Sequence, residues 1–151
     1  MSKPTELATN MRNAVTILSV TPYEEDQFWL QTIIKRSKWR LYMADCLESA
    51  VAVLHKQEVG VVLSEKDLPP HSWTDILYVI NHLQDAPEFI VTSRLADERL
   101  WMEALNLGAS DVLAKPFNRD EVLRSVSLAS LNWHHRHEIA TGREMKRNER
   151  S

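Results

Sequence analysis

The sequence predicts an α/β fold in which helices cover both faces of a five-stranded parallel sheet. Short apolar runs of strand type alternate with helical patterns five times between residues 14 and 131. Such alternation is typical of parallel sheets with crossover helices. The run at residues 59–64 is almost entirely apolar, as expected of a strand that is buried on both faces.

Local signals place each element in order. The strands are predicted at residues 14–20, 40–44, 59–64, 88–92 and 112–114. The first helix begins near residue 24, the last follows residue 118, and the others are predicted at residues 47–57, 73–83 and 96–107. The segment 65–70 is predicted to be a polar loop broken by prolines.

Three element ends carry particularly clear signals. Gly108 supplies the left-handed backbone that a helix C-terminus prefers. Asn118 is predicted to cap the last helix, with Glu121 in the capping-box position. The acidic trio at residues 24–26 falls in the first turn of the first helix, where the helix dipole favours negative charge.

Composition limits the class of protein. The 151 residues are 44% hydrophobic, carry a formal net charge of -3 and include a single cysteine. This excludes an internal disulfide and a protein built to coat nucleic acid. No apolar run approaches the ~20 residues of a membrane span, and the start of the chain lacks a secretory signal. We therefore expect a cytoplasmic protein that binds neither membranes nor nucleic acid.

The chain is predicted to form one domain with two appendages. Residues 1–13 are expected to be a flexible arm, residues 14–131 the domain, and residues 132–151 a helix extension followed by a polar tail or linker from residue 141. His134 and His137 lie at helical i, i+3 spacing, which suits transition-metal binding or pH sensing. Two histidines without further ligands are more often solvated helix surface.

Polar residues gather where the predicted strands end. Ligands of such folds sit at the carboxyl ends of the strands, and these ends carry Thr21, Glu65, Thr92 and Lys115. Lys115 precedes Pro116 at the point where the last strand leaves the core. Its ammonium is thus placed to meet an anion, and we expect that anion to be Glu65.

Three motifs resemble one known family. Residues 108–117 (GASDVLAKPF), residues 90–93 (IVTS) and the Leu68-Pro69 turn resemble the response-regulator receiver domain, over roughly residues 14–131. The resemblance implies a flavodoxin-like (βα)5 three-layer sandwich. It also implies a switch and anion pocket formed by Thr92, Lys115 and Pro116.

The chain departs from this family where phosphotransfer requires a match. The family's phosphoacceptor aspartate lies four residues before the proline, which gives Glu65 here. The acidic pair that holds Mg²⁺ corresponds to Thr21 and Pro22. A glutamate reaches one methylene further than an aspartate, and neither Thr21 nor Pro22 supplies a carboxylate for Mg²⁺.

We therefore expect a pseudo-receiver: a regulatory module of bacterial signalling or transcription that is not an enzyme and uses neither cofactor nor metal. Glu65 then either mimics the phosphorylated state or is solvated and silent. The alternatives are phosphorylation at a displaced carboxylate, Glu65 or Asp67, and a purely structural homodimer module.

The resemblance also implies a partner surface on the helices at residues 96–107 and after residue 118. Its exposed candidates are Arg94, Arg99, Trp101, Arg119 and Arg124. The partner would be a histidine kinase, an effector domain or the transcription machinery, and the same two helices could form a homodimer.

Overall fold

The computed structural model describes the backbone of residues 14–149 and the side chains of residues 14–142. The arm predicted for residues 1–13 lies outside the described residues. The main sheet has five parallel strands in the order β2-β1-β3-β6-β7. Their bounds are β1 Thr16–Val20, β2 Arg40–Ala44, β3 Val61–Glu65, β6 Glu88–Ser93 and β7 Asp111–Ala114.

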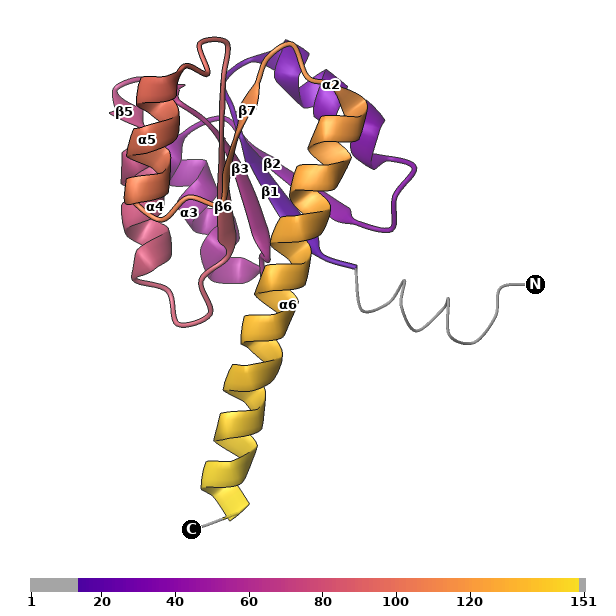
Figure 1. Cartoon of the computed structure of the whole chain (residues 1–151), viewed down its shortest axis with the longest axis vertical. Coiled ribbons are helices and arrows are strands. Elements are labelled where there is room, and N and C mark those ends of the chain that lie inside the picture. Colours follow the sequence, from indigo (N-terminus) through magenta and orange to yellow (C-terminus); the bar gives the residue numbers. More distant parts are fainter. Residues whose placement is uncertain (1–13, 150–151) are drawn as a thin grey trace, which may run out of the picture.

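Five helices cover this sheet in two layers (Figure 1). Helices α2 (Glu24–Ile34) and α6 (Arg119–Glu149) pack on one face. Helices α3 (Leu47–Lys56), α4 (Trp73–Asn81) and α5 (Glu98–Asn106) pack on the other. The predicted flavodoxin-like sandwich is confirmed.

Alternation along the strands builds the two apolar layers. In β1, Leu18 and Val20 face the layer of α3, α4 and α5, whereas Ile17 faces the layer of α2 and α6. Successive side chains of a strand point to opposite faces, so a central strand must be apolar at nearly every position. All five residues of β3 are accordingly buried.

The predicted end signals are present. Gly108 has φ 97° just after α5, and the Asn118 side chain accepts a hydrogen bond of 3.0 Å from the backbone N–H of Glu121. Glycine adopts this positive φ without the steric cost that a Cβ would bring. These two residues therefore fix how the chain enters and leaves β7.

Two segments differ from the prediction. The expected loop after β3 contains a short antiparallel hairpin, β4 (Asp67–Leu68) and β5 (His71–Ser72). Helix α6 continues through the predicted polar tail and ends at Glu149, well beyond the sheet (Figure 1). Local composition signals a polar surface there but cannot separate a solvated helix from a tail.

Among residues 14–149, none of the helices is long and apolar enough to cross a membrane.

Candidate functional site

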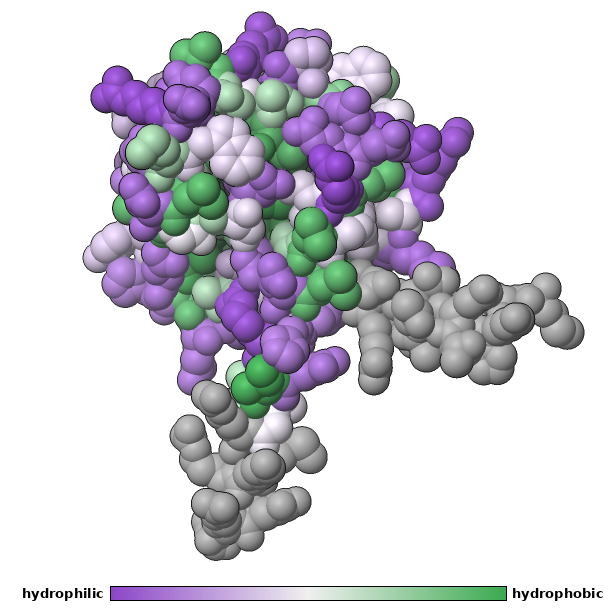
Figure 2. Space-filling model, in the orientation of Figure 1, coloured by the Kyte–Doolittle hydropathy of each residue, from purple (hydrophilic) through white to green (hydrophobic). Residues whose placement is uncertain are grey.

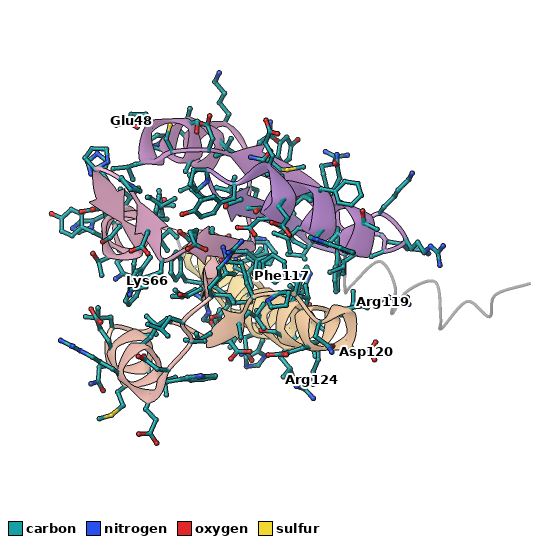
Figure 3. The ribbon with its side chains drawn as sticks, turned by 90° about the horizontal axis from the view of Figure 1, so that it is seen from above. Glu48, Lys66, Phe117, Arg119, Asp120 and Arg124 are labelled. Carbon is teal, nitrogen blue, oxygen red and sulfur yellow. The ribbon has the colours of Figure 1, made fainter. Side chains whose placement is uncertain are left out.

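The sheet brings the predicted site residues to one edge. Glu65, the last residue of β3, pairs with Thr92 of β6. Lys115 follows β7 and is fixed by a 3.0 Å hydrogen bond from its backbone N–H to the carbonyl of Ser93. Figure 3 looks onto this end of the molecule, where Lys66 and Phe117 mark the chain just after β3 and β7.

Glu65 is buried and paired. Only 4% of its surface is exposed, and its Oε2 lies 2.5 Å from the Lys115 Nζ. The Thr92 hydroxyl donates a longer hydrogen bond of 3.4 Å to the same oxygen. The expected Lys115–Glu65 contact is confirmed, and the alternative of a solvated Glu65 is wrong.

Asp26 is a second partner of Lys115, which was not predicted from the sequence. The Lys115 Nζ donates a hydrogen bond of 2.7 Å to Asp26 Oδ2, and the Thr21 hydroxyl donates one of 2.8 Å to the same oxygen. Asp26 precedes Leu30 by four residues and therefore shares its buried helix face. This i, i+4 spacing from an apolar residue is the signal in the sequence that Asp26 is buried. An acidic side chain that interacts only with the helix dipole can remain in solvent.

The network shifts the protonation of both of its central groups. Burial raises the pKa of Glu65 above its ordinary value, and the hydrogen bond and charge of Lys115 oppose this rise only in part. Burial lowers the pKa of Lys115, but the hydrogen bonds and charges of Asp26 and Glu65 outweigh that effect. The net pKa of Lys115 is raised, so it remains a cation.

A hollow of about 210 Å³ opens beside this network, between α2 and the loop after β7. Its rim includes Glu25 and Arg94, whose side chains approach to 3.6 Å. Such an exposed pair contributes little to stability. The Lys115 Nζ also lies 4.8 Å from the centre of the Tyr23 ring, so one aromatic face covers the ammonium.

The remaining residues of the predicted site lie outside the buried network. Pro22, Asp67 and Pro116 are exposed. Pro116 follows a cis peptide bond after Lys115. The structure thus gathers Thr21, Glu65, Thr92 and Lys115, adds Asp26, and leaves Asp67 on the hairpin.

The candidate partner residues are solvent-accessible. Arg94, Arg99, Arg119 and Arg124 are exposed, and Trp101 is 37% exposed. Figure 3 shows Arg119 and Arg124 pointing outward from the first turns of α6. Figure 2 shows apolar patches among polar side chains over α5 and α6; the exposed apolar side chains of these helices include Trp101, Met102, Leu105, Leu128 and Leu131.

Comparisons with known proteins agree with this architecture. A signal receiver domain of an HD domain-containing protein from Pseudomonas fluorescens Pf-5 is 25% identical, with a TM-score of 0.76, and the match covers 83% of this chain and 93% of that chain. The Francisella response regulator 1452 receiver domain is 18% identical (TM-score 0.71; 78% and 98% covered). The chemotaxis response regulator CheY4 of Vibrio cholerae is 16% identical (TM-score 0.69; 77% and 98% covered). The last two likenesses show the fold alone, and no curated protein matches the sequence.

The family assignment rests on the sequence as well as on the fold. The family model described as the response regulator receiver domain matches residues 17–127, most of the chain. The chain belongs to the response regulator receiver domain family.

Proposed function

We propose that this receiver domain acts without phosphorylation, as a pseudo-receiver that signals through protein contacts. One observation carries the proposal. The Lys115 ammonium lies within 2.5 Å of the Glu65 carboxylate and 2.7 Å of the Asp26 carboxylate. A cation supplied by the chain itself therefore occupies the position between the two buried acids.

The donor atoms at this edge do not fit the Mg²⁺ that the family resemblance implies. Mg²⁺ demands near-octahedral oxygen ligands, usually with one or two carboxylates. Asp26 Oδ2 and Glu65 Oε2 both contact the Lys115 ammonium, and the Thr21 hydroxyl donates its hydrogen bond to Asp26. A metal ion would have to share both carboxylates with the ammonium.

Glu65 is also unsuited to accept a phosphoryl group. Its side chain is longer than that of aspartate by about 1.5 Å, one C–C bond. In-line attack tolerates little displacement of this kind. Its carboxylate is engaged by Thr92 and Lys115, which supports a role as a built-in acidic group in the pocket, in place of a phosphoryl group.

Val112 supports a constitutive state. It occupies the position where many receivers carry a rotating aromatic residue, and it is 3% exposed. An aliphatic side chain cannot report a switch by burying a large ring. The output would be contact through the exposed side chains of α5 and α6 with a histidine kinase, an effector domain or the transcription machinery in the cytoplasm.

Incubation with acetyl phosphate and Mg²⁺, followed by intact mass measurement, tests the proposal. We expect no phosphoryl adduct under conditions in which a phosphorylatable receiver is modified in the same tube. A stoichiometric adduct would overturn the proposal, and peptide sequencing would then show whether Glu65 or Asp67 carries it.

The variant Glu65→Asp separates the two obstacles. It restores the short carboxylate but leaves Lys115 bound to Asp26 and leaves Thr21 and Pro22 without carboxylates. We expect no adduct on this variant either. Phosphorylation of Glu65→Asp alone would show that side-chain length is the sole obstacle and would contradict the part assigned to Lys115 and Asp26.

A further inference from the structure

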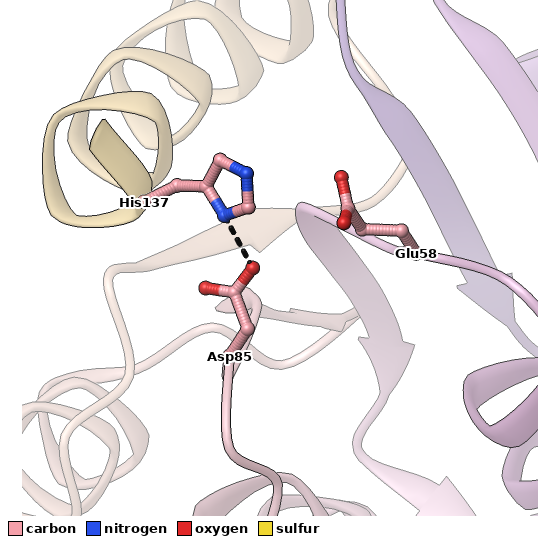
Figure 4. A group of neighbouring side chains, drawn as sticks. All are labelled: Glu58, Asp85 and His137. Carbon is pink, nitrogen blue, oxygen red and sulfur yellow. Dashed lines mark hydrogen bonds and ion pairs between the residues drawn. The ribbon is translucent and has the colours of Figure 1, made fainter. Parts of the chain in front are cut away.

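A cluster of metal-ligating side chains lies at the other end of the molecule, near the amino ends of the strands. Glu58 precedes β3, Asp85 precedes β6, and His137 belongs to the part of α6 that runs past the sheet. Their ligand atoms lie within 4.8 Å of one another. Figure 4 shows the imidazole and the two carboxylates pointing toward one another.

The imidazole is held in position from two sides. The His137 ring stacks on Trp133, with centroids 4.7 Å apart and planes 12° from parallel. Its Nδ1 lies 2.5 Å from Asp85 Oδ2. Trp133 is itself buried and packs so closely over Gly60 that a Cβ there would lie 3.0 Å from the indole.

The neighbouring residue fixes the same turn of α6. Arg136 donates a hydrogen bond of 3.2 Å to the carbonyl of Ala86, and it lies 3.2 Å from the Glu88 carboxylate. The turn that carries His137 is therefore attached to the segment that carries Asp85. A preoriented ligand lowers the ordering cost of binding, and this distinguishes the cluster from a group of exposed acids.

The donor set is that of a divalent transition metal. One imidazole nitrogen and two carboxylates suit Zn²⁺, which binds nitrogen and carboxylate oxygen at similar distances. With a neutral imidazole, the two carboxylates leave an uncompensated negative charge that a divalent cation would neutralise. Arg136 is paired with Glu88, and so it contributes its charge mainly to a different acid.

We propose that Glu58, Asp85 and His137 bind a divalent transition-metal ion of the zinc type, which fastens the projecting part of α6 to the body of the domain. Three protein ligands leave a fourth tetrahedral position for water. This site lies at the opposite end of the sheet from Glu65 and Lys115. If the chain does not bind the metal ion, the proposed pseudo-receiver function is therefore unaffected.

Only small movements are needed for coordination. Ligand atoms on one tetrahedral zinc ion lie about 3.3 Å apart, given metal–ligand distances near 2 Å. Glu58 is exposed, so its side chain can rotate inward without disturbing the core. The direct Asp85–His137 hydrogen bond is replaced when both groups bind the ion.

The other histidine singled out by the sequence does not belong to this site. His134 Nε2 lies 2.8 Å from the carbonyl of Ala14, in contact with the chain just before β1. The i, i+3 pair expected from the sequence is thus divided between two partners. His137 finds its co-ligands on loops that lie 52 residues or more earlier in the chain.

Calorimetric titration of the untagged 151-residue chain with ZnCl₂ tests the site. We expect saturable binding at one ion per chain, weakened at least about tenfold by His137→Asn or Glu58→Gln, since each removes a ligand. The matched control is His135→Asn, which changes an exposed histidine of the same helix and should bind as the parent does. No saturable binding, or equal binding by His137→Asn, would overturn the proposal.

Glu58→Gln keeps the test valid if the other variant folds poorly, because Glu58 is an exposed side chain. Hydrogen exchange of residues 134–142 gives the second readout. Zn²⁺ should slow exchange there in the parent and in His135→Asn, but not in Glu58→Gln. Zinc that binds without slowing this exchange would contradict the fastening of α6.

Discussion

Lys115 donates a hydrogen bond to Asp26, 89 residues earlier in the chain, and this bond joins the loop after β7 to the first turn of α2. Glu65 contacts the same ammonium from β3. Three segments therefore meet on one buried cation. Removing either kind of charge leaves the other uncompensated, and the predictions for this edge follow from that imbalance.

The variant Lys115→Met should lose about 3–5 kcal/mol of unfolding free energy, because it leaves two buried carboxylates without their cation. Urea denaturation at neutral pH measures the change. The control Lys56→Met alters an exposed lysine at the end of α3 and should change stability by less than about 0.5 kcal/mol. Equal effects of the two variants would mean that the buried pair contributes nothing.

The acid Asp26 should matter far more than its neighbour Glu24. Asp26 accepts hydrogen bonds from Lys115 and Thr21, whereas Glu24 is exposed. Asp26→Asn should destabilise the domain by about 1–3 kcal/mol, the cost of unsatisfied or mismatched buried polar groups. Glu24→Gln is the matched control. Comparable losses of stability in both variants would mean that Asp26 contributes only through its interaction with the helix dipole.

The pH dependence of stability should carry the signature of Glu65. Its folded-state pKa is raised above 4.5, so the folded state binds more protons than the unfolded state from pH 4.5 up to that folded pKa. Unfolding free energy must then fall as the pH rises through this window. Urea denaturation at successive pH values should show this fall in the parent, and the fall should be smaller in Glu65→Gln. Parallel pH profiles would show that Glu65 titrates alike in both states.

The order of strands and helices could be predicted because each element carries its own periodicity and end signals, as Gly108 and Asn118 show. The Lys115–Glu65 contact could be predicted because parallel strands place their carboxyl ends together. The partners of Asp26 and His137 could not be found in this way. These partners lie on segments distant in sequence, and locally Asp26 reads as helix charge and His137 as helix surface.

Close packing at Gly60 should control how firmly α6 is attached. A Cβ at this position would clash with the Val15 side chain and lie 3.0 Å from the Trp133 ring. Gly60→Ala should therefore destabilise the domain by about 1–3 kcal/mol, as overpacking does. Gly142→Ala in α6 is the control, because nothing lies within 4 Å of its added Cβ, and it should be neutral or stabilising. Thermal unfolding measures both, and a neutral Gly60→Ala would contradict the close approach of Trp133.

Self-association is the most direct test of the surface formed by α5 and α6. Leu128 and Leu131 are 58% and 52% exposed on α6, and Met102 is 66% exposed on α5. If these side chains meet a second copy of the chain, sedimentation velocity should show a concentration-dependent dimer. Leu128→Lys should then raise its dissociation constant at least about tenfold, because a charge would be buried in the contact. Tyr78→Lys on α4 is the control, since Tyr78 is 68% exposed but lies outside this surface. A monomer at every concentration would rule out the homodimer and leave the surface to a different protein partner.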